Sequence, residues 1–262
     1  MKLSKIALAA LLLVTASSAH DLWVVAKQDK NLSVDLIYGH DFANPEPIAK
    51  KRLSLFDTPY ALGKNGKTKL SQVGENYHYE ATKVGDDTHI IVASYKPTDW
   101  TQKSDGKWEM NKNRADFPDA KQCLRSSFKA KFILAGNDDG SFATKALGEG
   151  LEITPVSALG EIRAGEISRF RLTRDGEPVA NAEITGGFAG YVSDHGADKG
   201  DGHGGDNDEM RAFFNKTDKN GEFSFKPLVG GLWFVSTEVE RSLDDSKCEK
   251  EWSQASLTFW VK

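Results

Sequence analysis

Apolar and polar positions alternate with period two in many short runs along this chain. The first clear run is NLSVDLIYG (residues 31–39). Three more precede residue 100: RLSLFD (52–57), YHYEA (77–81) and HIIVASY (89–95). Alternation over 4–8 residues is typical of a half-buried β-strand, so each of these runs predicts a strand.

The same pattern returns after residue 150. Six runs carry it: LEITPVS (151–157), SRFRLT (168–173), VANAEIT (179–185), GEFSFKP (221–227), LWFVSTEVE (232–240) and ASLTFWVK (255–262). Short turns such as RDGEP and DKNGE separate several of them. Because glycines and acids interrupt the alternation at residues 136–150, we expect an N-terminal β-domain over 20–148 and a C-terminal Ig-like β-sandwich over 149–262.

One segment favours a helix. FPDAKQCLRSSFKAK, residues 117–131, has Pro118 near its first turn and Asp119 placed to interact with the helix dipole. The expected fold class is therefore all-β, with two β-sandwich (Ig-like) domains and one short helix in the connecting region.

Residues 1–19 have the pattern of a cleaved export signal. Two lysines precede an apolar stretch of nine residues, Ile6 to Val14, which is too short to span a bilayer. Ser17 and Ala19 then supply the small side chains that a signal peptidase requires, so cleavage after Ala19 is favoured. No second run of membrane-spanning length follows, so we expect a periplasmic mature form that is not embedded in a membrane.

Charge and cysteine content agree with export. The chain has 34 basic and 38 acidic residues, and removal of residues 1–19 takes away two lysines, which leaves a net charge of −6. An acidic balance argues against a nucleic-acid partner. Cys123 and Cys248 are the only cysteines, and in an oxidising compartment they predict one disulfide; two buried free thiols are the alternative.

Cleavage after Ala19 would make His20 the first residue of the mature chain. Its α-amine and imidazole Nδ1 can then chelate one metal ion, and nitrogen-rich sites of this kind suit Cu(II) and Ni(II). Cleavage one or two residues earlier, which would start the chain at Ala19 or Ser18, also leaves a chelating terminus. The alternative is that His20 stands there by chance, ahead of the first strand.

His40 is the natural second ligand. It follows the glycine that ends a predicted strand in YGHDF, where the mature terminus can reach it. Asp41 is expected to orient its imidazole. The alternative is a turn histidine bonded to a nearby carbonyl. His78 and His89, in neighbouring predicted strands, are weaker candidates for the same site.

The segment SDHGADKGDGHGGDNDE, residues 193–209, is a second candidate. It contains His195 and His203 among aspartates and glycines, and such dense glycine does not support a packed element. Histidines with carboxylates suit Ni(II), Zn(II), Co(II) or Cu(II). We expect a loop that captures ions weakly and passes them to the terminus; the alternative is a solvated acidic loop.

Two resemblances extend this interpretation. Residues 150–262 are similar to small Ig-like, transthyretin-like modules, through the segments DGEPVANAEI, TDKNGEFSF and GLWFV. The mature start AHDLW, the GHDF segment, FKAKFILAG and the closing ASLTFWV together resemble a family of exported bacterial proteins, the NikM-like periplasmic components of nickel or cobalt uptake systems. That resemblance implies partnership with the components of a membrane nickel or cobalt transporter.

The expected function is therefore periplasmic binding of a divalent transition metal, nickel or cobalt first and copper as a possibility. The expected ligands are His20, His40, His195 and His203. No nucleophile elbow, His-Glu-x-x-His motif, phosphate loop or CxxC pair is present in the sequence, so we expect no enzymatic activity. A copper-dependent histidine-brace protein or enzyme and a purely structural β-module remain the alternatives.

Overall fold

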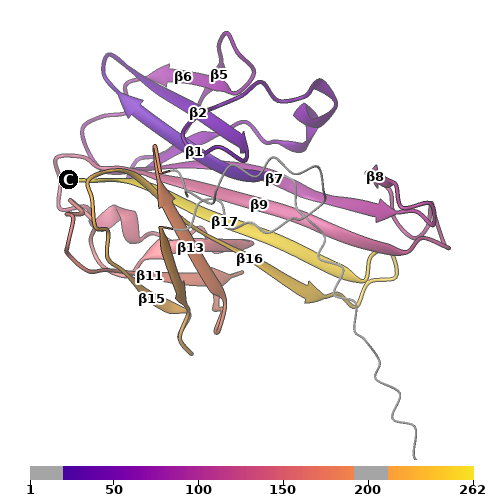
Figure 1. Cartoon of the computed structure of the whole chain (residues 1–262). Helices are drawn as coiled ribbons and strands as arrows, with labels where there is room; N and C mark the ends of the chain where they lie inside the picture. The colour runs from indigo at the N-terminus through magenta and orange to yellow at the C-terminus, as the bar shows by residue number, and fades with distance from the viewer. Residues whose placement is uncertain (1–19, 192–211) are drawn as a thin grey trace, which may run out of the picture.

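The computed structural model describes residues 20–191 and 212–262, and this part of the chain is almost entirely β (Figure 1). Its largest sheet has nine strands in the order β14-β13-β16-β17-β9-β7-β3-β4, with β8 paired to β7. The bounds are β3 (Tyr60–Gly63), β4 (Gly66–Lys69), β7 (His89–Gln102), β8 (Trp108–Met110), β9 (Gln122–Leu134), β13 (Glu183–Phe188), β14 (Phe213–Lys216), β16 (Gly231–Ser242) and β17 (Lys250–Val261). The predicted all-β class is confirmed.

Two smaller sheets cover the opposite faces of this central sheet, as Figure 1 shows. The first has the order β1-β2-β6-β5, with β1 (Asp21–Gln28), β2 (Asn31–Gly39), β5 (Ser71–Gln72) and β6 (His78–Thr82). The second consists of β10 (Leu151–Pro155), β11 (Ser168–Arg174), β12 (Glu177–Pro178) and β15 (Glu222–Phe225). The molecule is thus two β-sandwiches that share their middle layer.

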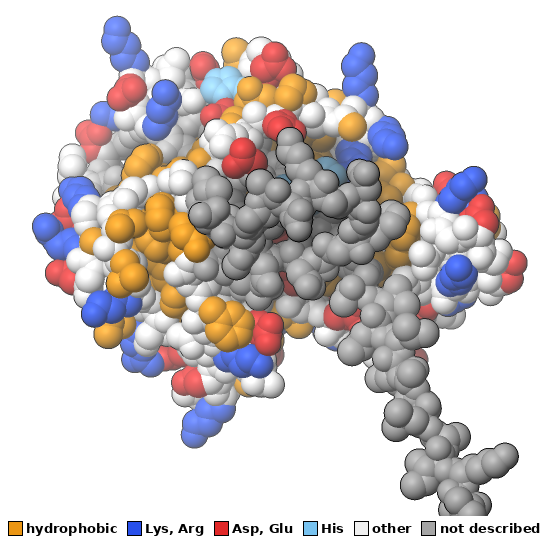
Figure 2. All heavy atoms as spheres, in the orientation of Figure 1, with side chains coloured by type: hydrophobic (Ala, Val, Ile, Leu, Met, Phe, Trp, Pro, Cys, Tyr) orange, Lys and Arg blue, Asp and Glu red, His pale blue; other side chains and the backbone are white. Residues whose placement is uncertain are grey.

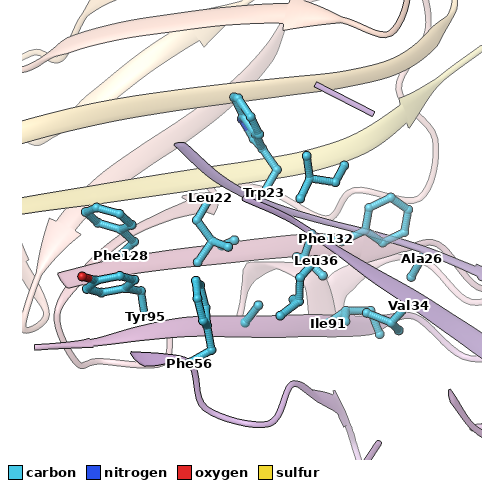
Figure 3. Close-up of a cluster of buried hydrophobic side chains, with 14 of the residues drawn as sticks. Leu22, Trp23, Ala26, Val34, Leu36, Phe56, Ile91, Tyr95, Phe128 and Phe132 are labelled. Atoms are coloured by element: carbon cyan, nitrogen blue, oxygen red, sulfur yellow. The ribbon is translucent and has the colours of Figure 1, made fainter. Parts of the chain in front are cut away.

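The central strands are apolar on both faces because each face packs on a different sheet. In β7, Ile91 and Ala93 belong to the core shared with β1 and β2, whereas Ile90 and Val92 belong to the core shared with β10 and β11. Figure 3 shows the first of these cores, in which Leu22 and Trp23 of β1 face the central strands. A strand buried on both faces has a continuous apolar run, which explains HIIVASY.

The central sheet is continuous across residue 148. Strand β9 pairs with β7 in antiparallel orientation and with β17 in parallel orientation, from Lys250 opposite Leu124 to Thr258 opposite Phe132. Strands from both halves of the chain therefore belong to one hydrogen-bonded sheet. The division into units of 20–148 and 149–262 stays a prediction.

The helix expected over 117–131 is wrong, because β9 begins at Gln122. Phe128, Ala130 and Phe132 alternate with Lys129 and Lys131, which is the period of a strand. The lysines and the alanine favour a helix locally, but pairing with β7 and β17 and burial of the Phe128 face override that preference.

Two short 3₁₀ helices occur in the described residues, η1 (Lys50–Leu55) and η2 (Ser141–Thr144). The first replaces the strand predicted for RLSLFD. It buries Leu55 and leaves Leu53 exposed. Among the described residues, no helix is both long and apolar enough to cross a membrane.

The predicted disulfide between Cys123 and Cys248 is confirmed. It joins the start of β9 to the connection between β16 and β17, with the two Cα atoms 4.8 Å apart. Since 125 positions separate the two cysteines, the bond closes a long loop through the middle of the fold.

Strand β1 is fastened to the central sheet by side chains of β17. The Leu22 N–H donates to Gln254 Oε1 at 2.8 Å, and Ser256 Oγ donates to the Leu22 carbonyl at 2.7 Å. Thr258 Oγ1 donates to the carbonyl of Val24. Among the described strands β1 has no neighbour on that side, so these bonds satisfy its outer edge and fix the position of its first residues.

Candidate metal centre

The register of β1 and β2 brings His20 and His40 together. Asp21 lies opposite Gly39 in this antiparallel pair, and the same register continued by one residue places His20 opposite His40. Their ring centroids are 5.0 Å apart, with the planes tilted by 44°. The two histidines that the sequence singled out as primary ligands are therefore neighbours, and their role as ligands stays a prediction.

Tyr38 and Arg52 complete this cluster around His20. The ring of Tyr38 stacks on the imidazole of His20 with centroids 4.8 Å apart. Arg52 of η1 donates from Nη1 to the Tyr38 hydroxyl at 3.2 Å, and the same Nη1 lies 3.4 Å from His20 Nδ1. Because a guanidinium only donates hydrogen bonds, Nδ1 presents its lone pair to Arg52.

The imidazole of His20 is neutral at physiological pH. Its pKa is lowered to about 4, mainly by burial and in addition by the positive charges of Arg52 and His40. A histidine must be unprotonated to bind a metal ion. At pH 7 the imidazole of His20 therefore has no proton to lose before it binds a metal ion.

A carboxyl group lies next to the cluster. Burial raises the pKa of Asp21 to about 6, and this effect outweighs a hydrogen bond from Gln254, the charge of His40 and a hydrogen bond with Glu238, which all lower it. The carboxyl of Asp21 is therefore engaged by β16 and β17, where Glu238 and Gln254 lie opposite each other.

The other candidates lie elsewhere. His78 Nδ1 is 2.6 Å from Asp35 Oδ1 on the β1-β2-β6-β5 sheet, and His89 Nδ1 is 2.7 Å from the carbonyl of Asp87 at the start of β7. Strands β6 and β7 belong to different sheets, so the hairpin that would have joined these histidines to one site is absent from the described structure. His195 and His203 lie outside the described residues.

The role predicted for Asp41 is not what the structure shows. Its Oδ2 accepts a hydrogen bond from Asn44 Nδ2 at 2.9 Å, within the turn that follows β2. The carboxylate of Asp41, which was expected to orient the imidazole of His40, therefore makes a hydrogen bond to Asn44 within its own turn.

A metal site at His20 and His40 would need a third donor, which the α-amine of His20 could supply only if the chain is cleaved after Ala19. Within residues 20–191 and 212–262, no three His, Cys, Asp or Glu side chains converge in a way that would hold a metal ion. In the uncleaved chain, the nitrogen of His20 is part of a peptide bond to Ala19. The donor set of two imidazoles and one amine thus exists only after cleavage.

Sequence reasoning missed Arg52 and Tyr38. Tyr38 belongs to the alternating run of β2 and looked like an ordinary strand residue. Arg52 lay in a run that predicted a strand, and only the 3₁₀ turn of η1 carries its guanidinium to the cluster. No local signal in KKRLSL indicates a contact with a residue 32 positions earlier.

Basic and acidic side chains are interspersed over the face of the molecule that Figure 2 shows.

The family model described as "Domain of unknown function (DUF4198)" matches residues 17–241. No curated protein matches the chain. Among solved structures, the "D0-D1 domain of Intimin" is 13% identical, with 91% of this chain and 97% of that chain covered and a TM-score of 0.21. The "D00-D0 domain of Intimin" is 12% identical, with 91% and 99% covered and a TM-score of 0.20. At these scores the likeness carries no argument about function.

Proposed function

The chain belongs to the family described as a domain of unknown function, DUF4198, and from its own residues we propose that it binds one divalent transition metal ion in the periplasm. The ligands are the α-amine and imidazole of His20 and the imidazole of His40. The observation that carries this proposal is the position of His20 beside His40; the proposal adds that cleavage after Ala19 frees the α-amine of His20.

We take nickel or cobalt as the metal, as the resemblance to NikM-like proteins implies, with copper as the alternative. Three nitrogen donors suit metals that accept tetragonal nitrogen-rich geometry, and cells select among them by availability as much as by affinity. In the proposed role the protein is a binding protein and not an enzyme. It supplies the ion to components of a membrane nickel or cobalt uptake system, as its resemblance to NikM-like proteins implies.

The decisive test compares two forms of the protein that differ only at the terminus. One begins at His20, as verified by mass spectrometry, and the other carries an extra methionine before His20. Equilibrium dialysis against Ni(II), Co(II), Cu(II) and Zn(II) measures stoichiometry and affinity. We expect one ion per chain for the first form and a large loss of affinity for the second. Equal binding by both forms would contradict the proposal.

His40 and His78 make a matched pair of variants, because both histidines belong to the β1-β2-β6-β5 side of the molecule. His40→Ala removes a proposed ligand, whereas His78→Ala removes a histidine that contacts Asp35 and Glu80. We expect weaker metal binding only for His40→Ala. If neither form of the wild-type protein binds any of the four ions, the structural β-module becomes the better description.

The segment that contains His195 and His203 has a separate test. We propose that it captures ions weakly and passes them to the terminus. Replacement of both histidines by alanine should lower the rate of metal capture or the stoichiometry. Unchanged capture would show that the segment has no such role.

For the copper alternative, oxygen consumption with ascorbate by the copper-loaded protein distinguishes an oxidase or oxygenase from a carrier.

A further inference from the structure

Within residues 20–191 and 212–262, the guanidinium of Arg52 makes no contact with a carboxylate. Its hydrogen-bond and ring contacts in the described part of the chain are to the hydroxyl and ring of Tyr38 and to Nδ1 of His20. No carboxylate of the described residues forms an ion pair with it. The carboxyl group of Asp21, which follows His20 in the chain, is bonded to Gln254 and Glu238.

Arg52 contacts Nδ1 of His20, the nitrogen atom that a chelated metal ion would use. Chelation by the α-amine and Nδ1 of His20 uses the Nδ1 lone pair, which now faces Arg52 Nη1 at 3.4 Å. A divalent cation bound there displaces the guanidinium from Nδ1 but leaves it tethered to Tyr38. Two like charges would then share a partly buried site, which weakens the binding of a bare cation.

An anion that arrives with the metal removes this conflict. Arginine binds a carboxylate through two parallel N–H···O bonds, and such charge-assisted bonds are among the stronger ones in proteins. Lys50 and Lys51 precede Arg52 in the same 3₁₀ helix, and both are exposed. They add positive potential on this side of the cluster, and such a potential attracts anions rather than free divalent cations.

We propose that the site takes its metal as an anionic chelate, in which a small polycarboxylate remains bound to the ion. His20 and His40 bind the metal, and Arg52 binds a free carboxylate of the chelator. This inference rests on the proposed function and names the chemical class of its substrate. It also makes Arg52 the residue that determines specificity between a chelated ion and a bare ion.

The test uses the mature protein with Ni(II) in three forms: the chloride salt, the citrate complex, and the complex with the neutral triamine diethylenetriamine. Carbon-labelled citrate shows directly whether the chelator stays with the protein during gel filtration. We expect one citrate to elute with each nickel ion, and tighter binding of the citrate complex than of the triamine complex.

Arg52→Gln is the diagnostic variant and Arg163→Gln is its matched control, because Arg163 is exposed and pairs with Glu161 outside the site. Arg52→Gln should lose about tenfold or more in affinity for nickel citrate, the effect of one lost charged hydrogen bond, and bind the chloride salt at least as tightly as wild type. Arg52→Lys keeps the charge without the fork and should recover part of that loss. Arg163→Gln should behave like wild type.

Each outcome separates the inference from the function on which it rests. Nickel that elutes without citrate, or Arg52→Gln that keeps the preference for the citrate complex, overturns the inference and leaves metal binding by His20 and His40 intact. A wild-type protein with a free His20 that binds none of the three nickel forms overturns both. The labelled-citrate measurement needs only the wild-type protein, so it stands even if a variant fails to fold.

Discussion

Lys131 donates a hydrogen bond from Nζ to the carboxylate of Glu152 at 2.9 Å, with both side chains almost completely excluded from water. Lys131 lies on β9 of the central sheet and Glu152 on β10 of the sheet that covers it. The carboxylate also accepts hydrogen bonds from the backbone N–H groups of Leu147 and Gly148 at 3.0 and 2.8 Å. This pair connects two layers of the fold with its polar atoms satisfied.

Removal of one partner should be costly because the other charge stays buried. For Lys131→Met we expect a loss of about 3–5 kcal/mol in the free energy of unfolding, measured by urea denaturation. Lys216→Met is the matched control, since Lys216 and Glu183 form an exposed pair that should contribute less than about 1 kcal/mol. A loss below 1 kcal/mol for Lys131→Met would show that the buried pair contributes little.

Gln254 fixes the start of β1, so Gln254→Leu should destabilise the fold. The substitution leaves the buried Leu22 N–H without its acceptor, at a cost of about 1–3 kcal/mol. Gln72→Leu is the control, because Gln72 makes its hydrogen bonds at the exposed surface and water can replace them. Thermal unfolding of the two variants measures the difference. Equal melting temperatures would mean that β1 does not depend on this bond.

His78 should make stability depend on pH. The hydrogen bond to Asp35 raises the pKa of His78, and the smaller contribution of Glu80 acts in the same direction. Since the folded state holds the proton more tightly, the stabilisation is complete below the unfolded pKa near 6.5 and is lost as pH rises through the higher folded pKa. His78→Gln should therefore destabilise the protein more at pH 5.5 than at pH 9.

The effect is about 0.5–1 kcal/mol, because the pair is partly exposed. Melting temperatures of wild type and variant at the two pH values test this prediction. The same substitution in an Asp35→Asn background should show a much smaller pH dependence. A difference between wild type and His78→Gln that is the same at both pH values would contradict it.

The disulfide should contribute substantially to stability, because it closes a loop of 125 positions in the unfolded chain. Replacement of Cys123 and Cys248 by serine should cost about 2–5 kcal/mol. Denaturation of the wild-type protein with and without reductant provides an independent measurement. An unchanged denaturation midpoint after reduction would mean that the disulfide adds no stability beyond that of the packing around β9.

Several features could be predicted from local sequence because they depend on local alternation. Residues 31–39 form β2 as expected, since every second residue faces the core. Residues 117–131 were predicted as a helix because Lys and Ala favour helices. The burial of both faces of this strand depends on sheets formed by other segments, so the local sequence does not reveal it. The run at 52–57 failed for a related reason: its two leucines fit a strand or a 3₁₀ turn equally well.

Some residues of the candidate site could likewise be predicted from local sequence, and others could not. His20 and His40 were identified from sequence, because a processing site and a glycine at a strand end are local signals. Arg52 and Tyr38 were not, since their relation to His20 depends on how η1 packs against β2. The loop histidines His195 and His203 remain a sequence prediction.

The sequence by itself determined the β class, the places of most strands and the cysteine pair, and it predicts a histidine at the start of the mature chain. Alternation and residue type are enough for these, because each reports the surroundings of its own segment. Only the tertiary structure decided that β9 pairs with β17 across the chain, that two β-sandwiches share one central sheet, and that the guanidinium of Arg52 lies against His20. Those relations join residues distant in sequence, and their energies come from burial and hydrogen bonding that exist only once the sheets have assembled.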